Sequence, residues 1–460
     1  MLFPGRIAAA LISGALLAQA HGLHPFWPLA WAAPIPLLIA VIGASRATAF
    51  LCGAIAGALS VAGMFAYMLD LSGPAPLAVF IVFKGLIWGG AALAASFADR
   101  HLPPAAAVFV FPALMAGVET LLAAISPHGT AGALAYSQMN FLPAIQVASL
   151  GGAPAVTFVP MLFGSLVAML IARRAFAAAL VPLVLIGAAL GFGYWRLSLP
   201  PAAETVRVAL LAADRFEGVP DDWRAVWAAY APQIERAADQ DYRIVLMPEK
   251  IARLSADERD AAVEQLAEIA RRRDVHLIFG VDAETGEGRF NRAYVASSGL
   301  PIASYDKRHM IPGFESHFTP GRASLQSGEA PARFGYAICK DMDFPAVGRA
   351  QAGADIVFVP AWDFGVDAWL HSRMAVLRGV ENGYAVVRSA REGVLTVSDA
   401  YGRVLAEAQS GPQAALNTQA PLGRPGPTLY ARVGDVFGGF CVAAGLLLAG
   451  WAIWRGRREA

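Results

Sequence analysis

The chain has 460 residues, of which 57% are hydrophobic and only 15% are charged, and its formal net charge is +1. Ordinary soluble domains carry about 25% charged residues, so a large part of this chain is expected to face something other than water. A net charge near zero gives no electrostatic reason to expect a nucleic-acid partner. The length allows a membrane domain plus one α/β domain of about 200 residues, large enough for its own core.

Ionisable residues are scarce before residue 204 and ordinary in number between 204 and 420. A helix needs about 20 apolar residues to cross a bilayer, and this criterion predicts eight spans. They lie near 5–22, 26–44, 47–69, 76–98, 104–125, 153–172, 176–196 and 434–454. The first two are short or interrupted by Pro28, Pro34 and Pro36, so they are also compatible with a re-entrant or tilted pair.

The predicted organisation has three parts. Residues 1–203 form a membrane domain of about seven helices, 204–420 form an α/β domain, and 421–460 form a last membrane helix with a basic tail. Lys and Arg lie in alternate short loops, namely at 6, 46, 100, 173–174 and 455–458, and are absent from the loops between them. Because positive loops favour the cytoplasmic side, both termini are expected inside and the α/β domain outside.

The α/β domain contains a single cysteine, Cys339, because Cys52 and Cys441 lie inside apolar runs. A disulfide framework is therefore excluded in this domain. The apolar patterns predict strands that alternate with helices, which is typical of an α/β layered fold. The predicted strands are 206–211, 244–247, 276–280, 293–297, 334–339, 356–359, 384–389 and 393–398, with helices at 221–240, 256–273 and 367–383.

Three of these strand ends carry reactive side chains, namely Glu249, Lys307 and Cys339. A free thiol is mostly protonated at neutral pH, and a nearby carboxylate can take its proton as a general base. A lysine can stabilise the oxyanion of a tetrahedral intermediate. Each residue has an ordinary alternative, as a small core residue or a surface charge, so it is the combination that indicates an acyl-transfer site.

Further motifs surround these residues in a fixed order along the chain. Pro248-Glu249, Tyr305-Asp-Lys307 with Glu315 eight residues later, Ile338-Cys339 and Ala361-Trp-Asp363 follow one another. With these motifs the sequence resembles the carbon–nitrogen hydrolase (nitrilase) superfamily, and more closely its membrane-embedded branch, the apolipoprotein N-acyltransferases. The resemblance extends over Trp369, His371, Arg378, Glu381, Arg388, Gly393 and the run 428–435.

The resemblance implies a four-layer αββα fold and a ping-pong reaction. Cys339 would attack an acyl ester of a membrane phospholipid, with Glu249 as the base and Lys307 holding the oxyanion. A thioester would remain, and the amine of a diacylglyceryl-cysteine lipoprotein would accept the acyl chain. Glu315 would support the site through Lys307 or the incoming amine. The resemblance implies no metal or organic cofactor, and a bacterial inner-membrane location with the catalytic domain in the periplasm.

Departures from the family pattern lie close to these residues. Lys340 and Asp341 follow the nucleophile where the family has an aromatic residue and a glutamate, and Asp341 is expected to serve for that glutamate. Residues 390–392 replace an expected pair of amides. Phe314 and Trp362 are candidates for acyl-chain contacts, although core aromatics need no function.

Because of these departures, two alternatives remain beside transfer to a lipoprotein. The first is a membrane-tethered amidase or an acyltransferase for another amine. The second is a catalytically silent membrane protein that binds lipid or lipoprotein.

Overall fold

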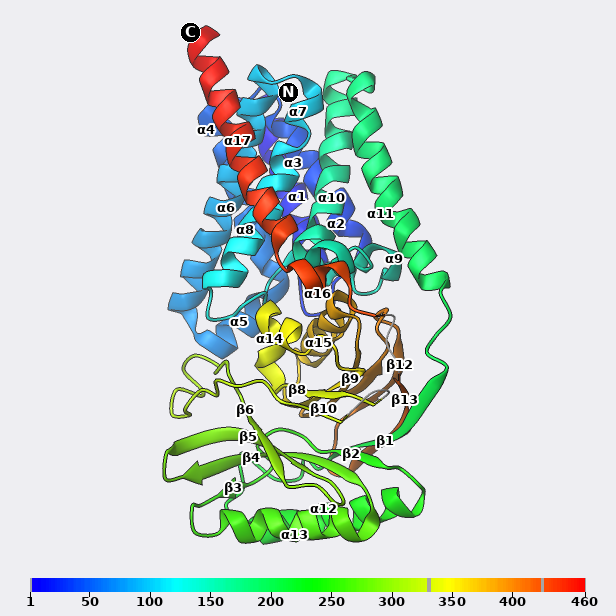
Figure 1. Cartoon of the computed structure of the whole chain (residues 1–460). Coiled ribbons are helices and arrows are strands. Elements are labelled where there is room, and N and C mark those ends of the chain that lie inside the picture. Colours follow the sequence, from blue (N-terminus) through cyan, green and yellow to red (C-terminus); the bar gives the residue numbers. More distant parts are fainter. Residues whose placement is uncertain (1, 329–331, 423–425, 460) are drawn as a thin grey trace. The chain divides into compact units, whose positions relative to one another are not determined.

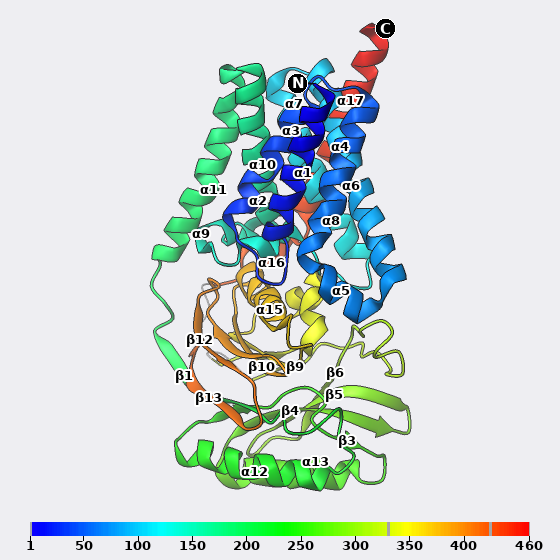
Figure 2. The ribbon, with the colours of Figure 1, turned by 180° about the vertical axis from the view of Figure 1, so that it is seen from behind.

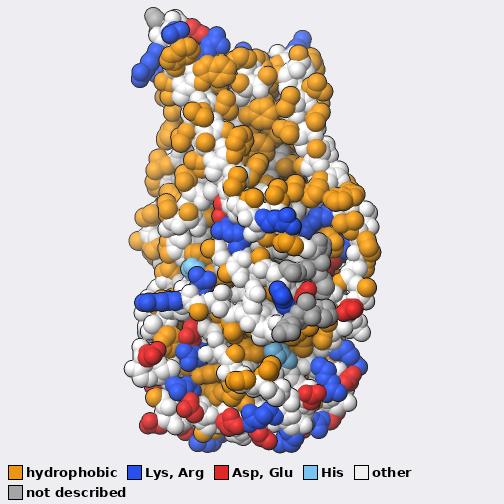
Figure 3. Space-filling model, in the orientation of Figure 1, with side chains coloured by type: hydrophobic (Ala, Val, Ile, Leu, Met, Phe, Trp, Pro, Cys, Tyr) orange, Lys and Arg blue, Asp and Glu red, His pale blue; other side chains and the backbone are white. Residues whose placement is uncertain are grey.

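The computed structural model of the protein describes residues 2–328, 332–422 and 426–459. Its contacts divide the chain into two compact units. The helical unit comprises Met1–Ile125, Gly132–Ser198 and Val433–Ala460, and the α/β unit comprises Ser126–Ala131 and Leu199–Arg432. The helical unit is covered largely by hydrophobic side chains, whereas charges of both signs mix on the surface of the α/β unit (Figure 3).

Seven helices among the described residues are long and apolar enough to cross a membrane. They are α1 (Phe3–Ala20), α4 to α5 (Arg46–Ser72), α6 (Pro74–His101), α7 to α8 (Pro104–Ile125), α10 (Ala148–Arg173), η3 to α11 (Phe176–Ser198) and α17 (Val436–Glu459). The predicted second span, 26–44, is instead two short helices, α2 (Pro28–Ala32) and α3 (Pro34–Val41). Each begins with a proline, which suits a first turn and divides the segment there.

The broken segment nevertheless returns the chain to the end of the unit at which α1 begins (Figure 2). The Arg6 guanidinium donates to the carbonyl of Ile42 over 3.1 Å, so the two ends of this hairpin lie together. Arg173 pairs with Asp99 at the same end, where both termini also lie (Figure 1). The alternating basic loops of the sequence thus share one end of the helical unit.

Two mixed sheets form the centre of the α/β unit. The first has the order β13-β1-β2-β4-β5-β6, with β3 paired to β4, and the second has the order β12-β11-β10-β9-β8-β7. The strands of the first are β1 (Glu204–Ala212), β2 (Ile244–Leu246), β3 (Arg253–Leu254), β4 (His276–Thr285), β5 (Gly288–Ala296), β6 (Ala303–Asp306) and β13 (Ala414–Leu422). Those of the second are β7 (Gln326–Ser327), β8 (Phe334–Tyr336), β9 (Ile356–Trp362), β10 (Ala385–Arg391), β11 (Val394–Ser398) and β12 (Val404–Gln409).

Helices cover the outer face of each sheet. On the first lie α12 (Trp223–Asp239) and α13 (Arg259–Arg273), and on the second lie α14 (Pro345–Ala350) and α15 (Ala368–Asn382). One apolar cluster fills the space between α12, α13 and the first sheet, a second lies between the sheets, and a third lies under α14 and α15. This arrangement confirms the predicted αββα fold.

Helix α12 illustrates how the hydrophobic pattern of the sequence corresponds to burial in the structure. Its N-terminus is capped by Asp222, whose carboxylate accepts a hydrogen bond from the Ala225 amide. Its apolar face is buried, and the Trp227 indole donates to the Ala262 carbonyl of α13 over 2.8 Å. Burying the N–H of this tryptophan is tolerated because it finds that partner.

Two predicted strand ends need correction. The strand predicted over 334–339 ends at Tyr336, and Cys339 begins a short 3₁₀ helix, η4 (Cys339–Asp343), instead of ending a strand. Lys307 follows β6 and not the strand predicted at 293–297. Strand β6 was missed because it has four residues, of which only Tyr305 is buried, so it carries little hydrophobic pattern.

The segment that carries Glu249 packs tightly on Gly280 of β4. A Cβ atom at Gly280 would lie 2.7 Å from both the Glu249 Cα and the Pro248 oxygen. We therefore expect Gly280→Ala to displace this segment and to lower the free energy of unfolding by about 1–3 kcal/mol. Thermal unfolding in detergent measures the change. The matched control is Gly286→Ala in the β4–β5 turn, where a Cβ meets nothing within 4 Å; equal midpoints for the two variants would contradict the packing argument.

Candidate active site

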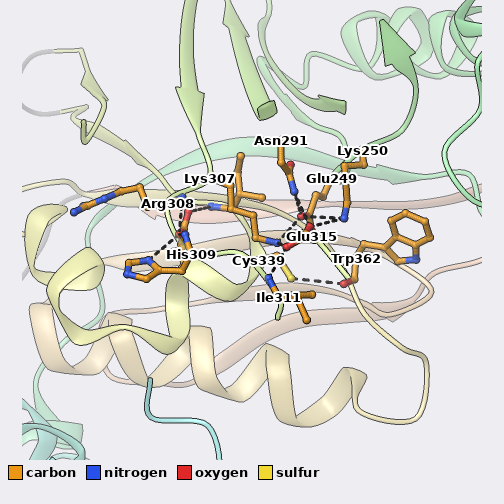
Figure 4. Close-up of polar contacts among 12 residues, drawn as sticks. Glu249, Lys250, Asn291, Lys307, Arg308, His309, Ile311, Glu315, Cys339 and Trp362 are labelled. Atoms are coloured by element: carbon orange, nitrogen blue, oxygen red, sulfur yellow. Dashed lines mark hydrogen bonds and ion pairs between the residues drawn. The ribbon is translucent and has the colours of Figure 1, made fainter. Parts of the chain in front are cut away.

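A buried lysine bridges two carboxylates between the ends of several strands (Figure 4). The Lys307 ammonium lies 2.8 Å from Glu249 Oε1 and 2.8 Å from Glu315 Oε2. Burial by itself lowers the pKa of Lys307, but the charges of Glu249, Cys339 and Glu315 outweigh it and raise that pKa well above its ordinary value. Lys307 therefore stays a cation although it is fully buried.

The two carboxylate oxygens of Glu249 differ in their hydrogen bonding. Its Oε1 accepts from Lys307 and from the side-chain amide of Asn291. Its Oε2 is buried and has no hydrogen-bond partner in the part of the chain that the structure describes. An unpaired buried polar atom is costly, and at this place it is an oxygen that can receive a proton.

Glu315 differs from Glu249, because both of its oxygens are fully engaged. Oε1 accepts from Lys250 over 2.5 Å and from Asn291 over 3.0 Å. Oε2 accepts from Lys307 and from the Ile311 amide, the latter over 2.9 Å. Burial raises the pKa of Glu315, but Lys307 and Lys250 lower it to about 2.

Cys339 lies at a sharp turn after β8, with a φ of +44°, which residues with a side chain seldom adopt. Its thiol is buried and lies 3.6 Å from the Trp362 carbonyl oxygen, to which it donates. Burial and the charge of Glu249 raise the pKa of the Cys339 thiol far above its ordinary value, and Lys307 opposes them. The resting thiol is therefore protonated and requires a base for reaction.

Asp341 holds the turn around Cys339 together. Its Oδ1 accepts from the backbone amides of Arg308 and His309, each over 3.0 Å. Its Oδ2 accepts from the Tyr305 hydroxyl over 2.8 Å and from the Ile338 amide over 3.2 Å. Asp341 thus ties the segment after Lys307 to the segment that carries Cys339.

Lys340, next to Cys339 in sequence, is paired with Asp343. Its ammonium lies 3.1 Å from Asp343 Oδ2, and both side chains are buried. The charges that act most strongly on the Cys339 thiol are instead those of Glu249, Lys307, Asp363 and Arg388.

A pocket of about 310 Å³ opens beside the carboxylates. Phe314 lines it and is 51% exposed, and its ring lies 5.5 Å from that of Phe364. Trp362 also lines the pocket, with the cations of Lys250 and Arg391 5.2 Å and 4.2 Å from its ring centroid. The full lining is Val219, Glu249, Lys250, Arg253, Asp282, Arg289, Ile311, Phe314, Glu315, His317, Phe318, Trp362, Asp363, Phe364 and Glu392.

The structure thus brings together the four sequence candidates Glu249, Lys307, Glu315 and Cys339, and it adds residues that the sequence did not single out. Asn291 bridges the two glutamates from β5, and Lys250 reaches Glu315 from the position after Glu249. The predicted start of the fourth strand at residue 293 left Asn291 outside it, whereas β5 begins at Gly288. The sequence also contains the buried cations Arg388 and Arg391, but it did not indicate which groups they would bond to.

Comparison with known proteins agrees with this fold. Residues 207–423 match the family model described as carbon-nitrogen hydrolase, so the α/β unit is a carbon–nitrogen hydrolase domain. Residues 13–166 match the model described as apolipoprotein N-acyltransferase N-terminal domain. The chain belongs to the apolipoprotein N-acyltransferase family and is a membrane-embedded acyltransferase of the carbon–nitrogen hydrolase type.

Individual relatives cover different parts of the chain. An apolipoprotein N-acyltransferase of Geobacter metallireducens is 26% identical over 97% of this chain and 95% of its own length. An (R)-stereoselective amidase of a Pseudomonas species is 29% identical over 35% of this chain and 62% of its own. The crystal structure of an amidase from Nesterenkonia superposes with a TM-score of 0.43 and 24% identity, over 48% of this chain and 92% of the amidase.

Proposed function

We propose that the protein transfers an acyl chain from a membrane phospholipid, through a thioester on Cys339, to the N-terminal amine of a diacylglyceryl-cysteine lipoprotein. The family membership supports the reaction type. The observation that carries the assignment of roles is the charge arrangement at Lys307, which leaves Glu249 Oε2 unpaired beside a protonated thiol.

In the first half-reaction, Glu249 takes the thiol proton as Cys339 attacks the ester carbonyl carbon. The developing oxyanion is stabilised by the ammonium group of Lys307, which is already held in place and so needs no reorganisation. When the intermediate collapses, the C–O bond breaks and Glu249 returns the proton to the departing oxygen. A lysophospholipid leaves, and the acyl chain remains on sulfur as a thioester.

In the second half-reaction, the neutral amine of the acceptor attacks the thioester carbonyl. Glu249 removes the amine proton, Lys307 again stabilises the oxyanion, and the C–S bond breaks. The proton returns to the Cys339 sulfur, and an amide is released. Glu315 does not fit the role of a base toward the amine, because each of its oxygens already accepts two hydrogen bonds.

We further propose that the catalytic domain faces the periplasm from the inner membrane. The basic loops, with Arg6 and Arg173 among them, gather at one end of the helical unit, and such loops favour the cytoplasm. The chain leaves this unit after Ser198 and re-enters it at Val433, just before α17, at the opposite end from both termini. The pocket lining at Phe314 and Trp362 is proposed to contact the substrate chains.

Incubation of the purified protein with a phospholipid carrying a labelled acyl chain is expected to give an adduct on Cys339 that hydroxylamine removes, as expected of a thioester. Cys339→Ala is expected to lose the adduct and all acyl transfer while it still inserts into the membrane. Peptide mass spectrometry locates the label. Cys441→Ala is the matched control, because Cys441 lies in α17, and it should keep both adduct and activity.

Adding a diacylated lipopeptide then separates the candidate reactions. A mass gain of one acyl chain supports transfer, whereas free fatty acid alone supports an amidase-like hydrolase, the activity named for the Pseudomonas relative. A folded wild-type protein that forms no adduct at all would refute both enzymatic proposals and leave a binding role.

The orientation is tested with single cysteines at exposed positions in a background without Cys52, Cys339 and Cys441. We expect a cysteine at Glu287 to react with a membrane-impermeant maleimide in cells whose outer membrane has been made permeable. A cysteine at Arg457, in the C-terminal tail, should react only after lysis. The reverse pattern would place the catalytic domain in the cytoplasm and contradict the proposal.

A further inference from the structure

The residue after the proposed base has an unusual backbone and a firmly held position. Lys250 has a φ of +47°, in the left-handed region that residues other than glycine rarely adopt. Its carbonyl oxygen accepts a hydrogen bond of 3.1 Å from the buried guanidinium of Arg391, which also donates to the Phe216 carbonyl. The local fold thus fixes the direction in which the Lys250 side chain leaves the backbone.

That direction takes the ammonium group into the active site and not toward solvent. The Lys250 Nζ atom lies 2.5 Å from Glu315 Oε1 and 3.9 Å from Glu249 Oε1, and the side chain is only 11% exposed. The rings of Trp362 and Phe318 lie 5.2 Å and 5.7 Å from the ammonium, within the range of cation–π attraction. Figure 4 shows Lys250 pointing toward the same carboxylates as Asn291.

Lys250 changes the charge of the cluster. Without Lys250, the single cation of Lys307 would face the two carboxylates of Glu249 and Glu315. The cluster would then carry one uncompensated negative charge. With Lys250, two cations face two anions and the sum is zero. Since a negative cluster resists the formation of a further anion, its neutralisation favours both the thiolate and the oxyanion.

Lys250 also determines which of the two carboxylates can take up and release protons. It supplies one of the four hydrogen bonds that occupy Glu315, whereas it only approaches Glu249, whose Oε2 stays unpaired. We propose that Lys250 is a positioning residue of the acyl-transfer reaction: it neutralises Glu315 and so keeps Glu315 out of the proton transfers that Glu249 performs. This inference rests on the proposed function and deepens it.

The other charged groups around the thiol do not supply this compensation. Asp363 and Arg388 form a buried pair with each other, and their charges oppose one another at Cys339. Arg391 stacks on Trp362 and is committed to backbone carbonyls. Lys250 and Lys307 are the cations that bond to the carboxylates among the residues described.

The test measures the rate at which iodoacetamide alkylates Cys339 as a function of pH, with peptide mass spectrometry to separate Cys339 from the other two cysteines. Lys250→Met removes the charge but keeps an unbranched side chain of similar length. A cation removed from beside a carboxylate and a thiol makes both harder to deprotonate. The profile is therefore expected to move to higher pH by about one unit.

A second variant separates charge from geometry. In Lys250→Met/Glu315→Gln the cluster is again neutral, so the profile is expected to return most of the way to that of the wild type. Lys340→Met is the matched control, because Lys340 is also a buried lysine next to a site residue but is paired with Asp343. Its profile should coincide with that of the wild type.

The outcomes are distinct. The inference is supported if the alkylation profile of Lys250→Met lies at higher pH than that of the wild type and the added Glu315→Gln substitution reverses this shift. An unmoved profile in Lys250→Met, or a moved one that Glu315→Gln fails to reverse, overturns it. Alkylation of Cys339 needs no phospholipid, so the effect of Lys250 can be measured whether or not acyl transfer occurs. A wild-type protein whose Cys339 is alkylated normally but never forms an acyl adduct would refute the proposed function alone.

Discussion

The interaction on which the site depends is the ion pair of Lys307 with two glutamates inside the protein. A lone buried ammonium would lose its proton, and two facing carboxylates would not both stay ionised. Each charge therefore requires the others. Breaking such a cluster by removing one member leaves an uncompensated buried charge, at a cost of about 3–5 kcal/mol. Lys307 thus fixes the ionisation of the site as well as its geometry.

The αββα fold supplies the means to build this cluster from distant parts of the chain. Glu249 follows β2, Lys307 follows β6, and Cys339 follows β8, so the two sheets bring three segments to one place. Gly280 lets β4 approach the Glu249 segment closely, and Asp341 ties the segment after Lys307 to the turn that carries Cys339. The proposed chemistry therefore depends on close packing between strands as much as on the reactive residues themselves.

Much of the fold and of the site could be predicted, because it depends on patterns and motifs of residues that are close together in the sequence. Hydropathy indicates the membrane helices, alternation of strands and helices indicates the α/β class, and ordered motifs indicate Glu249, Lys307 and Cys339. The four-layer fold followed from the resemblance and is confirmed. The second apolar segment is two helices instead of one span, because prolines begin each piece.

What escaped prediction depends on distant contacts. Asn291 bridges Glu249 and Glu315, which lie 42 and 24 residues away, and no local pattern marks it. The turn at Cys339 was not predicted because the residues before it, 334–338, are as apolar as those of a strand. Lys340 is the charge next to Cys339 in sequence, but it is paired with Asp343. The lysine that joins Lys307 at the carboxylates is Lys250, the residue after Glu249.

In the proposed reaction, Lys307, held charged by both glutamates, stabilises the oxyanion of each half-reaction. The most direct measurement is the single-turnover rate of Cys339 acylation by phospholipid in Lys307→Met and in wild-type protein, both checked to be folded. We expect a rate lower by about 10²–10³-fold in the variant, as is usual for loss of an oxyanion-stabilising group. A folded variant that acylates at nearly the wild-type rate would contradict it.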